Sequence, residues 1–273
     1  MKKRFAMLAI FVAIFLLPYL CHGIENIMPV EKAKRALSKL KVSFTGDDFV
    51  RAAETGDVEL VNCFIAAGMD SCVINSNGAT AFHAAAFSGH EKIVELLINK
   101  GCNLNAKDNN TGMTALTMAA FNGCEKVAEL LTNKGVDLNI SDNEGRCALM
   151  AAIETENEKI AELLISKGCD LNVKNKNNKT SLMMAIEIGN EKIAAILISR
   201  DCDLNIKDKE GRTALMKAAE TGREKIVELL LSKGCDPAAK SNQGRTALEY
   251  AEMNFKSTIS DMLKTAAKKG MKK

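Results

Sequence analysis

The sequence predicts an all-α solenoid of about seven stacked helix–turn–helix units with hairpin-like loops. The first observation is a repeat: the segment GRTALMKAAETGREKIVELLLSKGCDPAAK, which begins at Gly211, recurs in recognisable form from Thr45 onward. The second is its period of 33 or 34 residues, which decides the architecture before any local element is assigned. The third is a composition with no Trp, 4% aromatic and 47% hydrophobic residues, which favours a helical stack over a sandwich or barrel. The units begin at Thr45, Gly78, Gly112, Gly145, Asn178, Gly211 and Gly244.

Each unit predicts a pair of helices that cannot be stable alone. In the unit from Gly211, Thr213 is placed to cap a first helix with apolar residues at helical spacing, and Gly222 ends it. A more apolar second helix follows, and Gly234 stands where its C-cap needs a left-handed residue. Neither helix buries its apolar stripe without neighbouring copies, so the units are expected to stack. Small residues at one register let the inner helices approach closely, namely Ala52, Ala85, Ala119, Ala152, Ala185 and Ala218.

The motif order resembles the ankyrin repeat over residues 45–260. Each unit runs from a G-x-T-A-L-x-x-A segment through E-K-I-V-E-L-L to K-G-C-D-L-N. The unit at Thr45 is degenerate and the one at Gly244 lacks the E-L-L segment, so they are expected to be the terminal caps. The chain departs from the family pattern because the Pro of T-P-L-H is missing throughout, Asp201 replaces a C-cap Gly and Asn178 replaces a hairpin Gly. The resemblance implies a module that binds a protein partner and catalyses no reaction.

Residues 1–23 predict a secretory signal peptide. Lys2, Lys3 and Arg4 precede an apolar run over 5–20, and Cys21, His22 and Gly23 follow it. We expect cleavage after Gly23 and a periplasmic or secreted location. The alternative is an uncleaved membrane anchor, although the run is shorter than the about 20 residues that span a bilayer.

The two ends of the mature chain are basic. Residues 24–44 place Val30, Ala33, Leu37 and Leu40 at helical spacing, which predicts either a helix that caps the first unit or an amphipathic helix on a membrane. Membrane contact is therefore expected only through residues 1–41. Residues 261–273 predict a basic, solvated tail.

Charge argues against nucleic acid as a partner. The net charge of +3 becomes zero when the signal peptide is removed, and the repeats between the basic ends are acidic. Binding to phosphates requires a continuous basic face, which this distribution does not provide. We expect a monomer that binds protein.

The cysteines are expected to be free thiols. Cys102, Cys169, Cys202 and Cys235 share one repeat position, so neighbouring members are separated by about 8–10 Å, the distance between packed helices. A disulfide needs Cα atoms closer than about 7 Å. The position of Cys72, in the degenerate first unit, is not explained by the repeat.

Nothing in the sequence predicts catalysis, a metal or a cofactor. His83 and His90 occupy the structural His positions of the resemblance, and no nucleophile, zinc or phosphate-loop motif is found. Enzyme and metal-binding functions remain the disfavoured alternative.

The resemblance implies that inner-helix ends and hairpin tips line a concave partner surface. The position before the turn holds Phe87, Phe121, Glu154, Glu187, Glu220 and Met253 in successive units. The position between the hairpin Gly and the capping Thr holds Ala79, Met113, Arg146, Lys179, Arg212 and Arg245. We expect Phe87, Phe121 and Met113 to form an apolar anchor, with a carboxylate column beside a cation column along the rest. The predicted partner-binding residues are Phe87, Met113, Phe121, Arg146, Glu154, Lys179, Glu187, Arg212, Glu220 and Arg245.

Each half of this surface has an alternative interpretation. The charge columns can pair with each other at little net energy, and so serve only solubility. The phenylalanine side chains can pack into a neighbouring unit instead of facing solvent.

Overall fold

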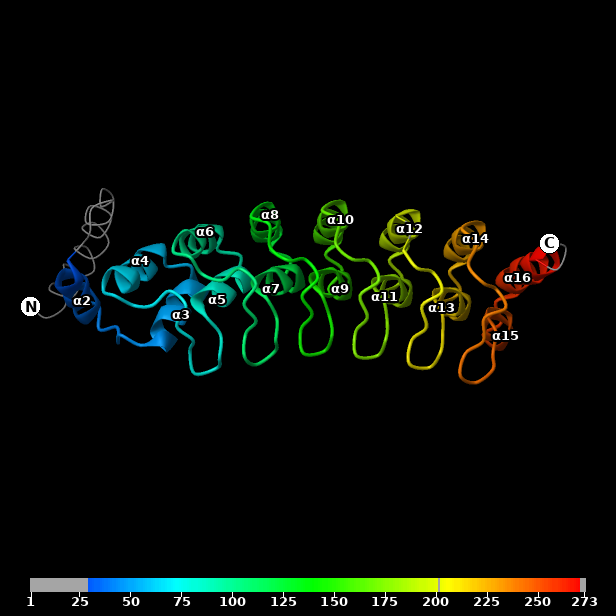
Figure 1. The fold of residues 1–273 in the computed structure, drawn as a ribbon, viewed down its shortest axis with the longest axis horizontal. Coiled ribbons are helices and arrows are strands. Elements are labelled where there is room, and N and C mark those ends of the chain that lie inside the picture. Colours follow the sequence, from blue (N-terminus) through cyan, green and yellow to red (C-terminus); the bar gives the residue numbers. More distant parts are fainter. Residues whose placement is uncertain (1–28, 201, 271–273) are drawn as a thin grey trace, which may run out of the picture. The chain divides into compact units, whose positions relative to one another are not determined.

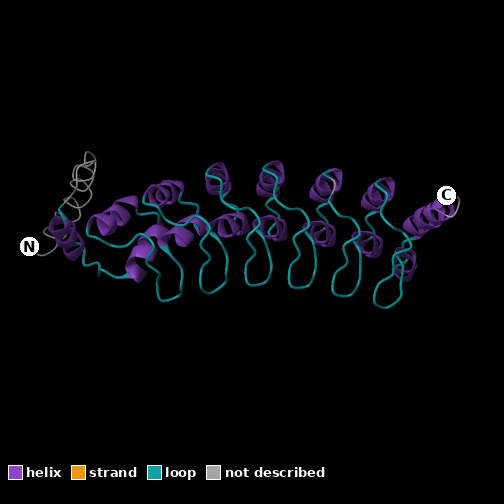
Figure 2. Ribbon diagram, viewed as in Figure 1, coloured by secondary structure: helices purple, strands orange, loops and turns teal. Residues whose placement is uncertain are grey.

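The computed structural model describes residues 29–200 and 202–270, and its regular elements there are helices (Figures 1 and 2). The predicted signal peptide and Asp201 lie outside the described residues. The chain divides into two compact units, which are described separately. The first runs to Asn103 and includes Asp108–Asn110, and the second holds Leu104–Lys107 and the residues from Thr111 onward.

The first unit contains two repeats and an N-terminal helix. Its helices are α2 (Val30–Lys39), α3 (Gly46–Thr55), α4 (Val58–Ala66), α5 (Ala81–Phe87) and α6 (Glu91–Asn99). Helix α2 packs against α4, and Ala33 and Leu37 of α2 are buried. The helix predicted within residues 24–44 therefore covers the first repeat.

The second unit contains the other repeats as helix pairs. Its helices are α7 (Ala115–Phe121), α8 (Glu125–Asn133), α9 (Ala148–Glu154), α10 (Glu158–Ser166), α11 (Ser181–Ile188), α12 (Glu191–Ser199), α13 (Ala214–Thr221), α14 (Glu224–Ser232), α15 (Ala247–Met253) and α16 (Ser257–Gly270). The inner helices α7, α9, α11 and α13 form one row and the outer helices α8, α10, α12 and α14 a second, with the hairpin loops on the side away from the outer row (Figure 1).

The predicted caps and turns organise the inner helices. Capping threonines accept a hydrogen bond from the backbone N–H at N3 in most repeats, as predicted for Thr213. Cys147 occupies the same position without a capping bond from its side chain. Gly222 ends α13 and Gly234 is left-handed, both as predicted, and Asn178 takes the hairpin conformation of Gly with φ 56°. These capping threonines are Thr45, Thr80, Thr114, Thr180, Thr213 and Thr246.

The core of each unit follows the predicted register of small residues. Ala52 and Ala85 in the first unit, and Ala119, Ala152, Ala185 and Ala218 in the second, are at most 1% exposed. Adjacent inner helices of the second unit pack at these positions, α11 against α13 for example. A larger side chain has no room there without displacing a helix.

The C-terminal helix is longer than the sequence boundary at residue 260 implies. Helix α16 continues to Gly270, and Ile259 and Leu263 on its inner side are buried. Residues 261–270 therefore continue the last helix, which packs against α14 and α15, and do not form a separate tail. Among the described helices, none is long and apolar enough to cross a membrane.

Candidate functional site

The hairpin side of the second unit carries a regular arrangement of charged side chains. In three of its repeats, a cation precedes the capping residue, and a carboxylate lies eight residues later near the C-terminal end of the inner helix. We call this surface the inner-helix face, and define it by Arg146, Glu154, Lys179, Glu187, Arg212 and Glu220.

The two charge columns pair with each other within each repeat. Arg146 Nη1 lies 2.8 Å from Glu154 Oε2, and Lys179 Nζ lies 2.7 Å from Glu187 Oε2. Arg212 Nη1 is further from Glu220, at 3.8 Å. Of the two interpretations of the columns, pairing is therefore the one realised in these three repeats. The face presents fixed dipoles rather than separate rows of charge.

Buried hairpin carboxylates hold the two arginines in place. Asp142 accepts a hydrogen bond from the backbone N–H of Arg146 at 2.8 Å, and it forms an ion pair with the guanidinium of Arg146 at 2.9 Å. Asp208 does the same for Arg212, at 2.8 Å and 3.0 Å. Because both carboxylates are almost fully buried, each guanidinium is oriented by a rigid hairpin and not by solvent.

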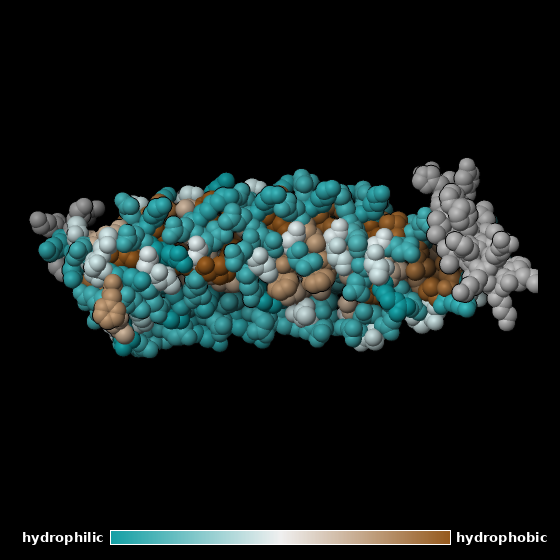
Figure 3. Space-filling view, turned by 180° about the vertical axis from the view of Figure 1, so that it is seen from behind, coloured by the Kyte–Doolittle hydropathy of each residue, from teal (hydrophilic) through white to brown (hydrophobic). Residues whose placement is uncertain are grey.

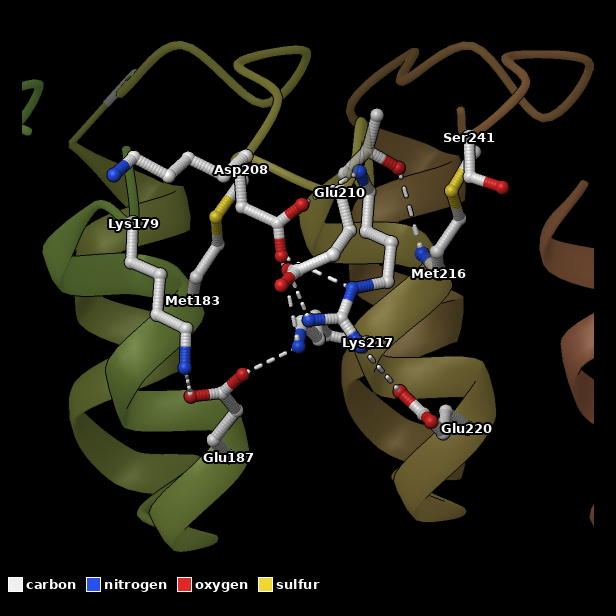
Figure 4. A network of polar contacts seen from close by, with 12 residues as sticks. Lys179, Met183, Glu187, Asp208, Glu210, Met216, Lys217, Glu220 and Ser241 are labelled. Atoms are coloured by element: carbon white, nitrogen blue, oxygen red, sulfur yellow. Dashed lines mark hydrogen bonds and ion pairs between the residues drawn. The ribbon is translucent and has the colours of Figure 1, made fainter. Parts of the chain in front are cut away.

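Lys217 is a buried cation that links two repeats, and it was not among the sequence-predicted site residues. Its side chain is 5% exposed, and its Nζ lies 2.6 Å from Glu187 Oε1 and 3.6 Å from Asp208 Oδ2 (Figure 4). It comes from α13, whereas Glu187 comes from α11. The corresponding register holds Met118, Ala151 and Met184 in the three preceding repeats, so the sequence signal was a lysine that follows three apolar residues at one register.

This network lowers the pKa values of its carboxylates. Burial is the largest influence on Glu187 and raises its pKa, but hydrogen bonds from Lys179 and Lys217 outweigh it, so the pKa lies below its ordinary value of 4.5. At Asp208, burial again comes first and is outweighed by the N–H of Arg212 and by the charges of Arg212 and Lys217, so the pKa lies below 3.8. Both carboxylates remain ionised near neutral pH.

Acid is therefore expected to remove the stability that this network contributes. Since both folded-state pKa values are depressed, the unfolded chain binds more protons in acid. The contribution is complete above the ordinary values of 4.5 and 3.8, and is lost as the pH falls through the folded-state pKa values. Urea unfolding at neutral pH and at a series of acidic pH values checks this. The variant carrying both Lys217→Met and Asp208→Asn should lose less stability in acid than the wild type, and an equal loss would contradict the assignment.

An open cleft of about 350 Å³ lies on the inner-helix face between the repeats of α9 and α11. The pairs Arg146–Glu154 and Lys179–Glu187 line it together with Met184 and Ile188. Ile188 is 38% exposed, so the cleft holds an accessible apolar side chain together with the two ion pairs. Such a cleft can accept an apolar side chain of a peptide whose neighbouring groups hydrogen bond to the paired charges.

The residues of the predicted apolar anchor are divided between the units. Phe87 ends α5 in the first unit and is 42% exposed. Phe121 ends α7 in the second unit, where it and Met113 are partly exposed. Each is accessible in its own unit, and their joint action as one anchor stays a prediction.

The last repeat breaks the pairing pattern. Met253 stands at the carboxylate position opposite Arg245 and is 53% exposed. Phe255 is 94% exposed and has φ 57°, in a turn where most repeats have Gly. Sequence reasoning overlooked Phe255, although alignment with Gly189 and Gly222 marks it as an aromatic at a left-handed position.

The two described histidines make structural hydrogen bonds. His83 Nδ1 lies 2.9 Å from Thr80 Oγ1 in a capping box, and His90 Nε2 donates to the carbonyl of Glu54 at 2.8 Å. Within residues 29–200 and 202–270, no three His, Cys, Asp or Glu side chains are grouped to hold a metal ion.

Most of the surface seen in Figure 3 is hydrophilic, with apolar residues in small separate patches.

Comparison with known proteins connects this geometry to a family. A family model described as ankyrin repeats in three copies matches residues 49–142, 134–208 and 182–272. A curated relative, L-asparaginase of Dirofilaria immitis, is 35% identical over 57 residues, or 21% of this chain. The chain spans only 10% of that protein's length. That similarity is shorter than two repeats and carries no argument about asparagine hydrolysis.

Proposed function

Because the chain belongs to the ankyrin-repeat family, whose arrays are protein-interaction scaffolds, we propose that it binds a protein partner through the inner-helix face. The observation that carries this proposal is the cleft between α9 and α11, which is lined by an accessible apolar side chain and two ordered ion pairs. The scaffold acts without catalysis, and its partner presents an extended or loop segment with an apolar residue flanked by polar groups.

The charges of this face serve orientation more than affinity. Partly exposed ion pairs contribute about 0–1 kcal/mol each, so the three pairs add little to stability. Their fixed dipoles attract a partner that places complementary charges opposite them, and they repel a partner that places like charges there. Selectivity is therefore assigned to the paired charges, and affinity to the exposed apolar side chains.

Replacing both Phe87 and Phe121 with alanine is expected to weaken partner binding most. Removing a buried aromatic anchor from an interface commonly costs about 2 kcal/mol or more, which is roughly thirtyfold in affinity. A pull-down from the native compartment with mass spectrometry first identifies the partner, and its affinity is then measured by calorimetry.

The matched control changes two lysines of the outer helices. Lys159 and Lys192 pair with carboxylates of those helices, Lys159 with Glu125 and Lys192 with Glu158. Lys159→Ala with Lys192→Ala should leave affinity nearly unchanged. Loss of binding in this control with retention in the phenylalanine variant would show that the partner uses the outer helices.

Reversing the charge of Glu154 and Glu220 is expected to slow association in a salt-dependent way. Exposed charges steer encounter more than they hold a complex, so the dissociation rate should change less than the association rate. Glu187 is unsuitable for this test because it holds the buried Lys217. Rates measured at low and high salt check the prediction, and a change confined to dissociation would contradict it.

We also propose that the scaffold is exported. The support is the basic and apolar pattern of residues 1–23, with cleavage after Gly23. N-terminal sequencing of the protein from cells tests this, because export by cleavage gives a chain that begins at Ile24. An intact N-terminus in a membrane fraction would favour the tethered alternative.

A further inference from the structure

One asparagine position links successive repeats as far as the repeat that begins at Gly211. The side-chain oxygen of Asn139 accepts a hydrogen bond from the backbone N–H of Asp170 at 2.8 Å. Asn105, Asn172 and Asn205 make the same bond to the following repeat, to Asp137, Asp203 and Asp236, at 3.0, 2.9 and 3.1 Å. The residue just before each of these aspartates lies at the register of Cys102, which holds cysteine in most repeats. A side chain at the asparagine position therefore reaches the cysteine position of the next repeat.

In the first repeat, this position holds Cys72 instead of asparagine. Its Sγ lies 3.6 Å from Sγ of Cys102, thirty residues later in the next repeat and within the same unit. The same spacing of thirty separates Asn139 from Cys169, so Cys72 reaches its neighbour as the asparagines do. Cys72 is exposed, whereas Cys102 is 7% exposed and its Sγ lies 3.5 Å from the carbonyl oxygen of Ser71.

This pairing differs from the one that the repeat spacing argues against. The spacing argument concerns cysteines at one register, such as Cys169 and Cys202, and it does not apply to a pair from two registers. The other cysteines of that register in the second unit, Cys169, Cys202 and Cys235, are each preceded at this spacing by asparagine. The replacement of asparagine by Cys72 is what brings a second thiol within 3.6 Å of Cys102.

We propose that Cys72 and Cys102 are a redox dithiol site that closes to a disulfide between the first two repeats when it meets a low-molecular-mass disulfide. The thiolate of Cys72 attacks one sulfur of that disulfide, forming a mixed disulfide and releasing one thiol. Cys102 then loses its proton and attacks the Cys72 sulfur, the mixed bond breaks, and the second thiol leaves. Two protein thiols are oxidised, and one external disulfide is reduced to two thiols.

The surroundings of the two sulfurs assign this order of attack. Cys72 is accessible to an external disulfide, while Cys102 is buried beneath it. Burial also raises the pKa of Cys102 to about 11, so little of Cys102 is thiolate near neutral pH, and an external disulfide meets Cys72 first. A bond length of about 2.05 Å requires the sulfurs to approach by only about 1.5 Å from van der Waals contact.

The disulfide would fasten the segment that carries Phe87. Helices α5 and α6 lie between Cys72 and Cys102, so the bond closes a loop around both. Cross-linking restricts the unfolded chain, and the closed form should resist unfolding of the first unit better than the dithiol form. The site therefore couples the redox state of the medium to the rigidity of these two repeats.

The test treats the reduced, purified mature chain with oxidised glutathione, alkylates the remaining thiols and maps the peptides by mass spectrometry. We expect a Cys72–Cys102 cross-link, a mass lower by two hydrogen atoms, six alkylated cysteines and a rise of roughly 5 °C in the Tm of the first unit. Persistent alkylation of both cysteines, or a glutathione that stays on Cys72, would overturn the proposal.

Cys72→Asn is the matched control because it restores the residue found in later repeats. It should fold like the reduced wild type and show no mass change and no rise in Tm. Adding Asn139→Cys to that variant should create a new cross-link to Cys169. A cross-link at Cys102 that survives Cys72→Asn, or no cross-link in the transplanted variant, would show that this position does not bring two thiols together.

Discussion

Lys217→Met is expected to lower the free energy of unfolding by about 3 kcal/mol, because it leaves a buried carboxylate with one cation fewer. Asp208 is fully buried and loses the ammonium at 3.6 Å, while its ion pair with Arg212 stays. Glu187 loses its closest partner, at 2.6 Å, but is partly exposed and keeps Lys179. Urea unfolding followed by far-UV circular dichroism measures the difference.

The chain itself provides the compensating change. Between α9 and α11, the corresponding positions hold Glu154, Asn175 and Met184, with no buried cation. Asn175 still accepts the hairpin hydrogen bond, from the N–H of Lys179 at 3.0 Å. The double variant Lys217→Met, Asp208→Asn copies this arrangement and should recover most of the lost stability. If the double variant is as unstable as the sum of the single ones, the ionic coupling between Lys217 and Asp208 is not what stabilises this contact.

The repeat made the architecture predictable. A fixed period places the caps, turns and small residues at equivalent positions in each copy, so one interpretable unit determines the others. This is why Thr213, Gly222 and Ala218 have the predicted roles, and why Asn178 could be aligned with the hairpin Gly of the other repeats. The repeat pattern is weaker near the ends of the chain, and there the predicted end of the repeat domain at residue 260 falls within helix α16.

The features that sequence reasoning missed depend on contacts between repeats. Cys72 and Lys217 each depart from the repeat pattern, but the role of each depends on a partner about one repeat away. The pairing of Arg146 with Glu154 depended on the side-chain conformations at the two ends of a helix. The choice between paired and separate columns could therefore not be made from residue types alone, because both arrangements have the same sequence pattern.

The repeat pattern also does not determine which partner binds. The period shows which positions face outward, but it constrains only the positions that pack. Phe87, Ile188 and Phe255 are exposed, so stacking does not restrict them, and their chemistry is available to a partner. The residues proposed to bind the partner are therefore those that the repeat pattern constrains least.

Ala218→Leu is expected to destabilise the chain by about 3 kcal/mol, because the added carbons have no space between α13 and its neighbours. Ala218 is fully buried, and α13 packs against both α11 and α15. Unfolding in urea should show a lower midpoint, and a strong effect would confirm that close approach of inner helices holds the stack together.

Deleting one whole repeat, Asn178 to Glu210, is expected to be tolerated better than that single substitution. Each repeat contacts mainly its neighbours, so the flanking repeats can stack on each other. The deleted segment includes Asp208, and the deletion places Lys217 opposite Glu154 and Asn175. Lys217 therefore loses one carboxylate partner, which is an ionic defect unrelated to stacking. The experiment is therefore made in the Lys217→Met background, where the new contact resembles that between α9 and α11. The shortened chain should keep its helicity per residue and a cooperative transition. If it unfolds while Ala218→Leu has no effect, stability does not arise from nearest-neighbour stacking.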